Sequence, residues 1–177
     1  MKISFVRHGE TISNKNATAT GWIDSPLTEE GFKQVEEMTK EIPTDFSKIY
    51  SSDLTRCKQT TEIINKKLNL PIIYDARLKE RNFGSLAGKT WDEIGSDLRK
   101  LDANQQFDYR PFGGESAEKV KDRLFKCIEE IKNNEKGEKI LVVSHAGIIR
   151  LLHNELNSKV HEQIHNSSLH EFEFKDD

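Results

Sequence analysis

The sequence predicts one α/β domain, residues 1–177, with a mostly parallel central sheet and an antiparallel strand at its edge. Two observations lead to this prediction. Short apolar runs alternate with longer segments that have helical periodicity, which is typical of strand and helix units around a parallel sheet. Residues 169–174 alternate between apolar and polar side chains, which is typical of a half-exposed edge strand. A chain of 177 residues can bury a sufficient core without disulfides or metals.

Four further strands are expected at short apolar runs, of which residues 140–143 form the clearest buried one. The runs cover residues 3–6, 48–50, 72–74 and 140–143. Between them, four helices are predicted from apolar residues at helical spacing. The first begins after an N-cap at Thr28 and ends before Pro43; its apolar positions are Phe32, Val35, Met38 and Ile42. The others carry Leu54, Cys57, Ile64 and Leu68; Ala117, Val120, Leu124, Ile128 and Ile131; and Ile148, Ile149, Leu152 and Leu156.

We expect Ser51, Ser52 or Asp53 to cap the second helix, and the third to start near Glu115. Residues 78–114 show no regular pattern, and glycines mark turns there.

Composition excludes several functional classes. The formal net charge is −3 with 32% charged residues, so no basic excess indicates a nucleic-acid partner. No apolar run reaches the length of a membrane span, and the first residues do not resemble a signal peptide, so we expect no membrane contact and a cytoplasmic location. Cys57 and Cys127 fall among apolar helix positions and are expected to be buried free thiols. The oligomeric state stays open.

Polar side chains follow the predicted strands at the points where the strands end. They are Arg7 and His8, Arg56, Glu80, and His145. The carboxyl ends of parallel strands open on one edge of the sheet, where such folds bind ligands. Two arginines and two histidines would then surround one small volume in a slightly acidic protein. This arrangement favours a dianion, and a phosphate monoester fits best.

The chemistry of phosphate ester cleavage gives Glu80 a role. An alkoxide is a poor leaving group, so a phosphomonoesterase without a metal needs a carboxylic acid to protonate it. The alternative for Glu80 is a solvated glutamate or an ion pair with Arg77 or Arg81. A neutral imidazole at His8 is able to act as nucleophile, base or metal ligand, and Gly9 allows the backbone to turn sharply beside it.

The ordered motifs resemble the histidine phosphatase, or phosphoglycerate mutase-like, superfamily. The opening motif is Arg7-His8-Gly9-Glu10-Thr11 with Asn14. The later blocks are, in chain order, Thr20-Gly21-Trp22, Ser51-Ser52-Asp53-Leu54-Thr55-Arg56, Leu78-Lys79-Glu80-Arg81-Asn82-Phe83-Gly84, Gly113-Gly114-Glu115-Ser116 and Val143-Ser144-His145-Ala146-Gly147. The resemblance covers most of the chain and implies a three-layer α/β/α sandwich.

The resemblance also implies a role for each matching residue. His8 is similar to the nucleophile that becomes a phosphohistidine, and Glu80 to the proton donor. Arg7, Asn14, Arg56 and His145 resemble the phosphate pocket, and Thr20 and Gly21 are expected on the substrate side. No metal and no cofactor are required, and the expected partner is a small phosphorylated substrate. For attack, the other nitrogen of His8 should donate to a backbone carbonyl.

The family contains mutases and phosphatases, and this sequence favours a phosphatase. Mutases have longer chains with a middle insertion and a closing tail, whereas this sequence stops soon after its last strand. Glu10-Thr11 and Asn82-Phe83-Gly84 also resemble the phosphatase branch. A cofactor-dependent mutase, and a protein that only binds phosphorylated ligands, remain the alternatives.

Two other motifs carry little weight. His161-Glu162-Gln163-Ile164-His165 fits the zinc-peptidase pattern, but it lies in a short polar connection rather than a sturdy helix. Residues 84–90 imitate a phosphate-binding loop with one residue too few between the glycines, and no buried strand precedes them. His153 and His170 are expected to be surface or packing residues.

Overall fold

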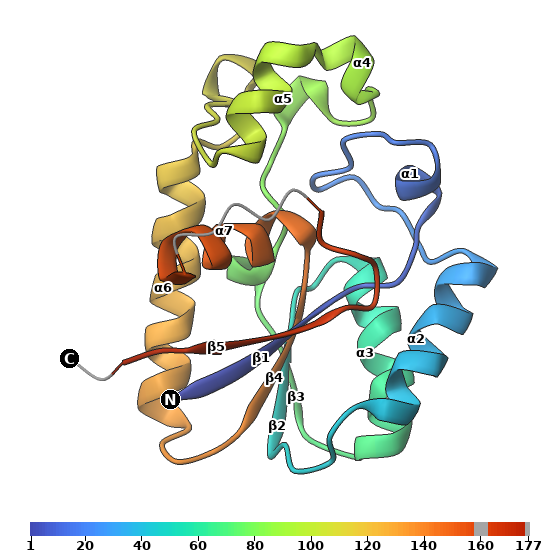
Figure 1. Cartoon of the computed structure of the whole chain (residues 1–177), viewed down its shortest axis with the longest axis vertical. Helices are drawn as coiled ribbons and strands as arrows, with labels where there is room; N and C mark the ends of the chain where they lie inside the picture. The colour runs from blue at the N-terminus through green and yellow to red at the C-terminus, as the bar shows by residue number, and fades with distance from the viewer. Residues whose placement is uncertain (158–162, 176–177) are drawn as a thin grey trace.

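A five-stranded sheet in the order β3-β2-β4-β1-β5 forms the centre of the protein (Figure 1). The computed structural model describes residues 1–157 and 163–175. The strands are β1 (Lys2–Arg7), β2 (Lys48–Ser51), β3 (Ile72–Tyr74), β4 (Ile140–Ser144) and β5 (Leu169–Glu173). All neighbours pair in parallel except β5, which runs antiparallel to β1. The predicted α/β class, mostly parallel sheet and antiparallel edge strand are confirmed.

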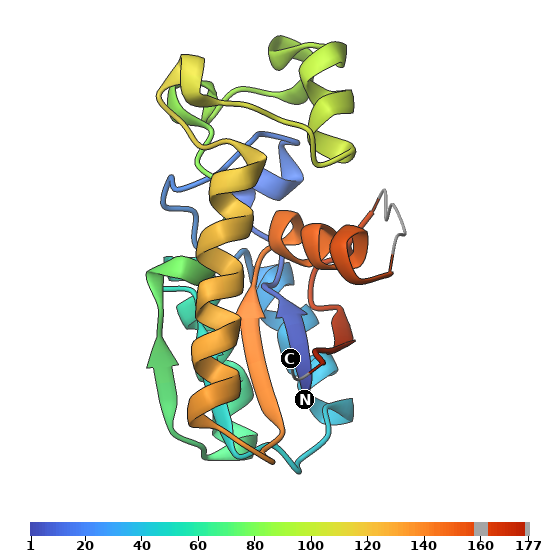
Figure 2. The same cartoon turned by 90° about the vertical axis from the view of Figure 1, so that its left-hand side faces the viewer.

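Successive side chains along each strand point to opposite faces of the sheet, so the core has two layers, one on each face. In β4, Ile140 and Val142 belong to one cluster of buried side chains, whereas Leu141 and Val143 belong to the other. Helices α2 (Glu29–Glu41) and α3 (Thr55–Leu68) cover the second cluster, and α6 (Ala117–Asn134) and α7 (Ala146–Asn157) cover the first. The two views of Figures 1 and 2 show these helices on opposite faces of the sheet. The result is the expected three-layer sandwich.

The start of α2 confirms one prediction and corrects another. Thr28 caps the helix, and its hydroxyl accepts a hydrogen bond from the Gly31 amide. Phe32, expected on the buried face, is 38% exposed. The backbone of Gly9 and Glu10 occupies the space beneath this first turn, and Gly31 is the residue that faces it.

The predicted cap of α3 is wrong. Its N-cap is Leu54, which offers no side-chain hydrogen bond. The Ser52 hydroxyl instead accepts a hydrogen bond from the Leu54 amide at 3.4 Å and also contacts His145. Its hydrogen bonds therefore stabilise the loop before the helix and not the first turn of α3.

The irregular middle of the chain forms short elements beyond the carboxyl edge of the sheet (Figure 2). These are the 3-10 turns η1 (Ala76–Leu78), η2 (Gly84–Leu86) and η3 (Arg110–Phe112), and the helices α4 (Trp91–Ile94) and α5 (Ser96–Ala103). The four-residue helix α1 (Ile12–Lys15) lies at the same end. These short elements therefore cover the edge of the sheet at which the predicted polar residues lie.

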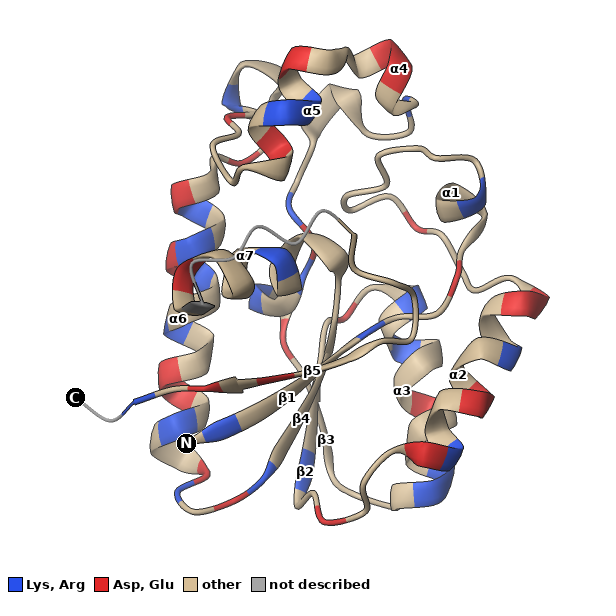
Figure 3. Cartoon of the chain, viewed as in Figure 1, with Lys and Arg blue, Asp and Glu red and all other residues tan. Residues whose placement is uncertain are grey.

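The surface carries charges of both signs on its outer helices. Figure 3 shows basic and acidic residues interspersed along α2 and α6, while the central strands are mostly neutral. Cys57 and Cys127 are buried free thiols, as expected. Within residues 1–157 and 163–175, no helix is both long enough and apolar enough to span a membrane.

Candidate active site

A cavity of about 260 Å³ opens at the carboxyl edge of the sheet. It brings together residues that are far apart in the sequence, from the end of β1, the loop after α1, the start of α3, the loop after η1, α5 and α7. Seven of the eight residues predicted for the site line it: Arg7, His8, Asn14, Thr20, Gly21, Arg56 and Glu80. The eighth, His145, is fully buried behind it.

His8 follows β1 directly and is 4% exposed. Its Nδ1 lies 2.7 Å from the Gly9 carbonyl oxygen. Because a carbonyl only accepts, Nδ1 carries the proton and Nε2 keeps its lone pair. The prediction that the second nitrogen of His8 donates to a backbone carbonyl is therefore confirmed. Burial, together with the positive charges of Arg56 and Arg7, holds the pKa of His8 well below its ordinary value of 6.5.

Arg7 and Arg56 provide two buried guanidinium groups beside His8. Arg7 donates to the Ile164 carbonyl, and its Nε has no hydrogen-bond partner among the described residues. Burial lowers the pKa of Arg7 to about 10, so the group stays charged at neutral pH. Arg56, 2% exposed, sits in the first turn of α3, where the helix dipole also favours an anion.

Arg56 also fixes the loop that carries Gly21. Its two terminal nitrogens donate to the carbonyl oxygens of Gly21 at 2.7 Å and Ile23 at 3.2 Å. Gly21 has a φ of +53°, and a Cβ there would lie 2.8 Å from the Phe83 ring. The loop therefore needs a glycine at this position, and Gly21 lines the cavity through its backbone.

His145 lies behind His8 rather than on the cavity wall. The two rings meet edge to face, with centroids 5.2 Å apart. Arg56 Nε donates to His145 Nδ1 at 3.3 Å, and His145 Nε2 donates to the Ser52 hydroxyl at 2.9 Å. Both ring nitrogens thus have protein partners. A direct bond from His145 to a ligand would have to replace one of them.

Glu80 is held by two backbone amides. Its carboxylate accepts from Arg81 N at 2.9 Å and from Gly147 N, in the first turn of α7, at 3.0 Å. Burial raises the pKa of Glu80, but the Arg81 charge and the two amides outweigh it and bring the pKa below its ordinary value of 4.5. In the ligand-free cavity Glu80 is therefore a carboxylate.

The backbone around Glu80 is fixed from two further sides. Arg123 of α6 donates to the carbonyl oxygens of Arg77, Lys79 and Glu80 at 2.6 to 3.0 Å. The Trp22 indole donates to the Glu80 carbonyl at 2.6 Å. Glu115, which is itself paired with Arg123, accepts a hydrogen bond at 2.9 Å from the backbone amide of Asn82, two residues after Glu80.

Asn14 and Thr20 lie on the wall formed by α1 and the loop after it. Asn14 Oδ1 accepts from Thr11 N and from Asn166 Nδ2, both at 3.1 Å. This orientation leaves the donating NH₂ group of Asn14 for a ligand. Thr20 lines the cavity with its hydroxyl 3.5 Å from the Thr18 carbonyl, which is a long contact that a ligand can replace.

Sequence reasoning missed four charged residues of the cavity: Arg81, Arg99, Asp102 and Arg150. Arg81 follows Glu80 directly and belongs to the same motif, but it is expected only as an ion-pair partner of Glu80 and not as a cavity residue. Arg150 lies one helical turn after Gly147, so its spacing in α7 is a usable signal. Arg99 and Asp102 lie in the irregular middle, where no pattern in the sequence places them.

The zinc-peptidase motif, residues 161–165, lies only partly within the described residues. Its residues His161 and Glu162 lie outside the described residues. Across the described parts of the chain, no three His, Cys, Asp or Glu side chains gather in a group that could hold a metal ion.

Comparisons of the sequence and of the structure with known proteins each find similar proteins. Residues 3–177 match the sequence profile of the histidine phosphatase superfamily (branch 1). The chain is 33% identical over 184 residues to phosphoglycerate mutase-like protein 4 of Arabidopsis thaliana, covering 99% of this chain and 80% of that protein. It is 35% identical to a metal-independent phosphoserine phosphatase of the same plant, covering 86% and 67%. The crystal structure of TTHB049 from Thermus thermophilus superposes with a TM-score of 0.83 at 28% identity, covering 97% and 92%.

Proposed function

Because the chain belongs to the histidine phosphatase superfamily (branch 1), we propose that it is a metal-independent phosphomonoesterase that acts through a phosphohistidine on His8. One observation carries the proposal. The Nδ1 proton of His8 is committed to the Gly9 carbonyl, so Nε2 is the nitrogen with a lone pair in a cavity that buried arginines make positive. An uncharged nucleophile beside cationic groups is what attack on a phosphate dianion requires.

In the first step, His8 Nε2 forms a bond to phosphorus while the bond to the ester oxygen breaks. Arg7 and Arg56 stabilise the charge on the remaining phosphoryl oxygens, with the Asn14 amide as a further donor and His145 acting through its contact with Arg56. Glu80 gives its proton to the leaving oxygen. A phosphate dianion beside Glu80 raises the pKa of that carboxyl by charge repulsion, so the group is protonated more readily with substrate bound.

In the second step, Glu80 is ionised and takes a proton from a water molecule. The water oxygen bonds to phosphorus, the bond from phosphorus to Nε2 breaks, and inorganic phosphate leaves. Glu80 is then protonated for the next cycle, and His8 regains its lone pair.

The size of the cavity supports a small substrate. Its volume of about 260 Å³ lies below the ~300–1,000 Å³ that is typical of sites for drug-sized ligands. Helices α4 and α5 cover the end of the molecule at which the cavity opens (Figure 2). A phosphorylated metabolite suits this enclosure better than a folded phosphoprotein.

The test is phosphate release from a panel of sugar phosphates, phosphoglycerates, nucleotides and an aryl phosphate, with chelator present. We expect release that the chelator does not change and that His8→Ala reduces by at least about 10³-fold. Release that needs a metal, or that survives in His8→Ala, would contradict the proposal. Binding of phosphate esters without any release would identify a phospho-ligand binding protein instead.

A cofactor-dependent phosphoglycerate mutase is the second candidate, because the similar proteins include phosphoglycerate mutase-like protein 4 and others named as phosphoglycerate mutases. The discriminating assay adds a bisphosphoglycerate and follows interconversion of the two phosphoglycerates. A phosphatase releases phosphate from both, whereas a mutase interconverts them faster than it hydrolyses either.

A further inference from the structure

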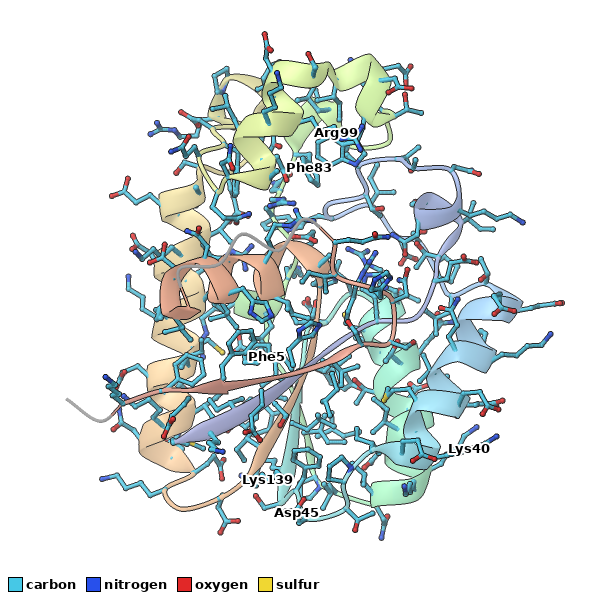
Figure 4. The ribbon with its side chains drawn as sticks, viewed as in Figure 1. Phe5, Lys40, Asp45, Phe83, Arg99 and Lys139 are labelled. Carbon is cyan, nitrogen blue, oxygen red and sulfur yellow. The ribbon has the colours of Figure 1, made fainter. Side chains whose placement is uncertain are left out.

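The cavity extends past the residues assigned to the phosphate, and its second part is lined by charged side chains with no role so far. Arg81 comes from the loop after η1, Arg99 and Asp102 come from α5, and Arg150 comes from α7. Figure 4 labels Arg99 on α5 and Phe83 below that helix, and both residues line the cavity. This group lies on the side of Glu80, because Arg81 Nε is 3.9 Å from the Glu80 carboxylate.

Arg81 is fixed in place but has unused donors. It is 4% exposed, and its Nη2 pairs with Asp102 Oδ1 at 2.6 Å. The rings of Phe83 and Phe107 lie 5.5 and 5.0 Å from its guanidinium carbon. Its Nε and Nη1 are buried and have no hydrogen-bond partner among residues 1–157 and 163–175. Buried donors without partners are costly, so an acceptor from a ligand is expected here.

Asp102 is not available as that acceptor, because its oxygens are already shared. One oxygen pairs with Arg81 Nη2 and lies 3.6 Å from Arg150 Nη1, and the other accepts from the Tyr109 hydroxyl at 2.7 Å. Arg99 precedes Asp102 by one turn of α5 and therefore shares its face of the helix. Unlike Arg81, Arg99 is exposed and stands at the entrance side of the cavity.

The charges of the cavity point to more than one anionic group on the ligand. Five arginines and two carboxylates line it, which leaves three positive charges. A phosphate dianion compensates two of them. With Glu80 ionised, one positive charge then remains on the side of Glu80, where the leaving alcohol of the substrate would lie, and protonation of Glu80 for the first step leaves a second.

We propose that Arg81 and Arg99 form a subsite for a second acidic group on the leaving alcohol of the substrate. The inference rests on the proposed function, since it defines which phosphate esters are preferred. Arg81 donates a hydrogen bond to the acidic group from one of its two unpartnered buried donors, and Arg99 holds the group from the entrance. A carboxylate and a second phosphate share this chemistry, because both present charged oxygens that accept hydrogen bonds from a guanidinium.

The experiment compares substrates that differ only in the second group. One pair is 3-phosphoglycerate and glycerol 3-phosphate, and the other is propane-1,3-diol bisphosphate and the monophosphate of the same diol. For each compound, kcat/KM is measured with the wild type, and Kd is measured by calorimetry with His8→Ala, which is expected to bind without turnover. Arg99→Gln is the test variant, because changing Arg81 would also shift the pKa of Glu80. Lys100→Gln is the matched control, since Lys100 is exposed on the same helix and does not line the cavity.

In at least one pair, we expect the doubly acidic compound to have about tenfold higher kcat/KM and correspondingly lower Kd. The pair with the larger ratio identifies carboxylate or phosphate as the second group. Arg99→Gln should reduce that ratio about fivefold or more, and Lys100→Gln should leave it unchanged. Equal kcat/KM and Kd within both pairs, or a ratio that survives in Arg99→Gln, would overturn the subsite while leaving the phosphatase intact. A Kd preference without any phosphate release would support the subsite and contradict the proposed function.

Discussion

His8 has different partners at its two ring nitrogens, and this difference gives it the properties of a nucleophile. Nδ1 donates to the Gly9 carbonyl, so the lone pair stays on Nε2. Burial and the charges of Arg56 and Arg7 keep the pKa of His8 low and the ring neutral. A neighbouring carboxylate in place of the carbonyl would favour the protonated ring and remove the lone pair.

The low pKa of His8 leads to a prediction for the pH dependence of the rate. A group whose pKa is lowered stays neutral down to more acidic pH, so kcat/KM should be maintained below pH 6.5 and should fall only at a lower pH. The measurement is kcat/KM against pH with two substrates whose phosphates titrate differently. If the acid limb of the pH profile shifts when the substrate is changed, that limb reports the titration of the substrate phosphate and not of His8. A fixed acid limb at or above pH 6.5 would contradict the neutral, buried imidazole.

Glu80→Gln tests the proton donor. An alkyl phosphate needs its leaving oxygen protonated, whereas an aryl phosphate needs this less. We therefore expect kcat to fall about 10²- to 10⁴-fold for an alkyl phosphate and much less for an aryl phosphate. Glu62→Gln, at an exposed position of α3, is the control for the loss of one carboxylate. Equal losses on the two substrates would remove the acid role from Glu80.

At the scale of elements, the start of α2 holds the loop that carries His8. A Cβ on Gly31 would lie 2.1 Å from the Glu10 carbonyl oxygen, and one on Gly9 would lie 2.6 Å from the Gly31 carbonyl oxygen. The two backbones therefore touch, and each needs a glycine at the contact. Helix α2 thus supports the site without contributing a side chain to it.

Gly31→Ala should destabilise the protein despite the higher helix propensity of alanine. The new methyl group would have to displace backbone, and such overpacking costs about 1–3 kcal/mol. The measurement is the free energy of unfolding by denaturant. Lys33→Ala, at an exposed position of α2, is the control and should be neutral or slightly stabilising. A Gly31→Ala protein as stable as wild type would show that the loop and α2 are not in the described contact.

Elements with strong periodicity are predictable from the sequence, and those governed by tertiary contacts are not. The apolar runs of β1 and β4 and the Thr28 cap are predicted correctly because their signals are local. The exposure of Phe32 depends on a distant backbone that fills the space under α2, and the uncapped start of α3 depends on Ser52 being used by His145. Neither contact leaves a trace in the local sequence.

At the scale of the whole molecule, parallel pairing of β1, β2, β3 and β4 explains why the site is predictable. Their carboxyl ends open on one edge, so polar residues that follow them converge (Figure 1). This rule places His8, Arg56 and Glu80 around one cavity. It cannot place Arg99 or Asp102, because α5 is reached through an irregular segment. The same rule places His145 at the correct edge of the sheet, but it does not show that the His145 ring lies behind His8.

The most direct test of the central claim is the identity of the phosphorylated residue during turnover. Enzyme and a good substrate would be mixed for milliseconds, quenched in alkali to preserve phosphoramidate bonds, digested and analysed by mass spectrometry. We predict a phosphoryl group on Nε2 of His8, absent from His8→Ala. A phosphoryl group on any other residue, or none during burst-phase release of the alcohol, would contradict the assignment of His8 as the nucleophile.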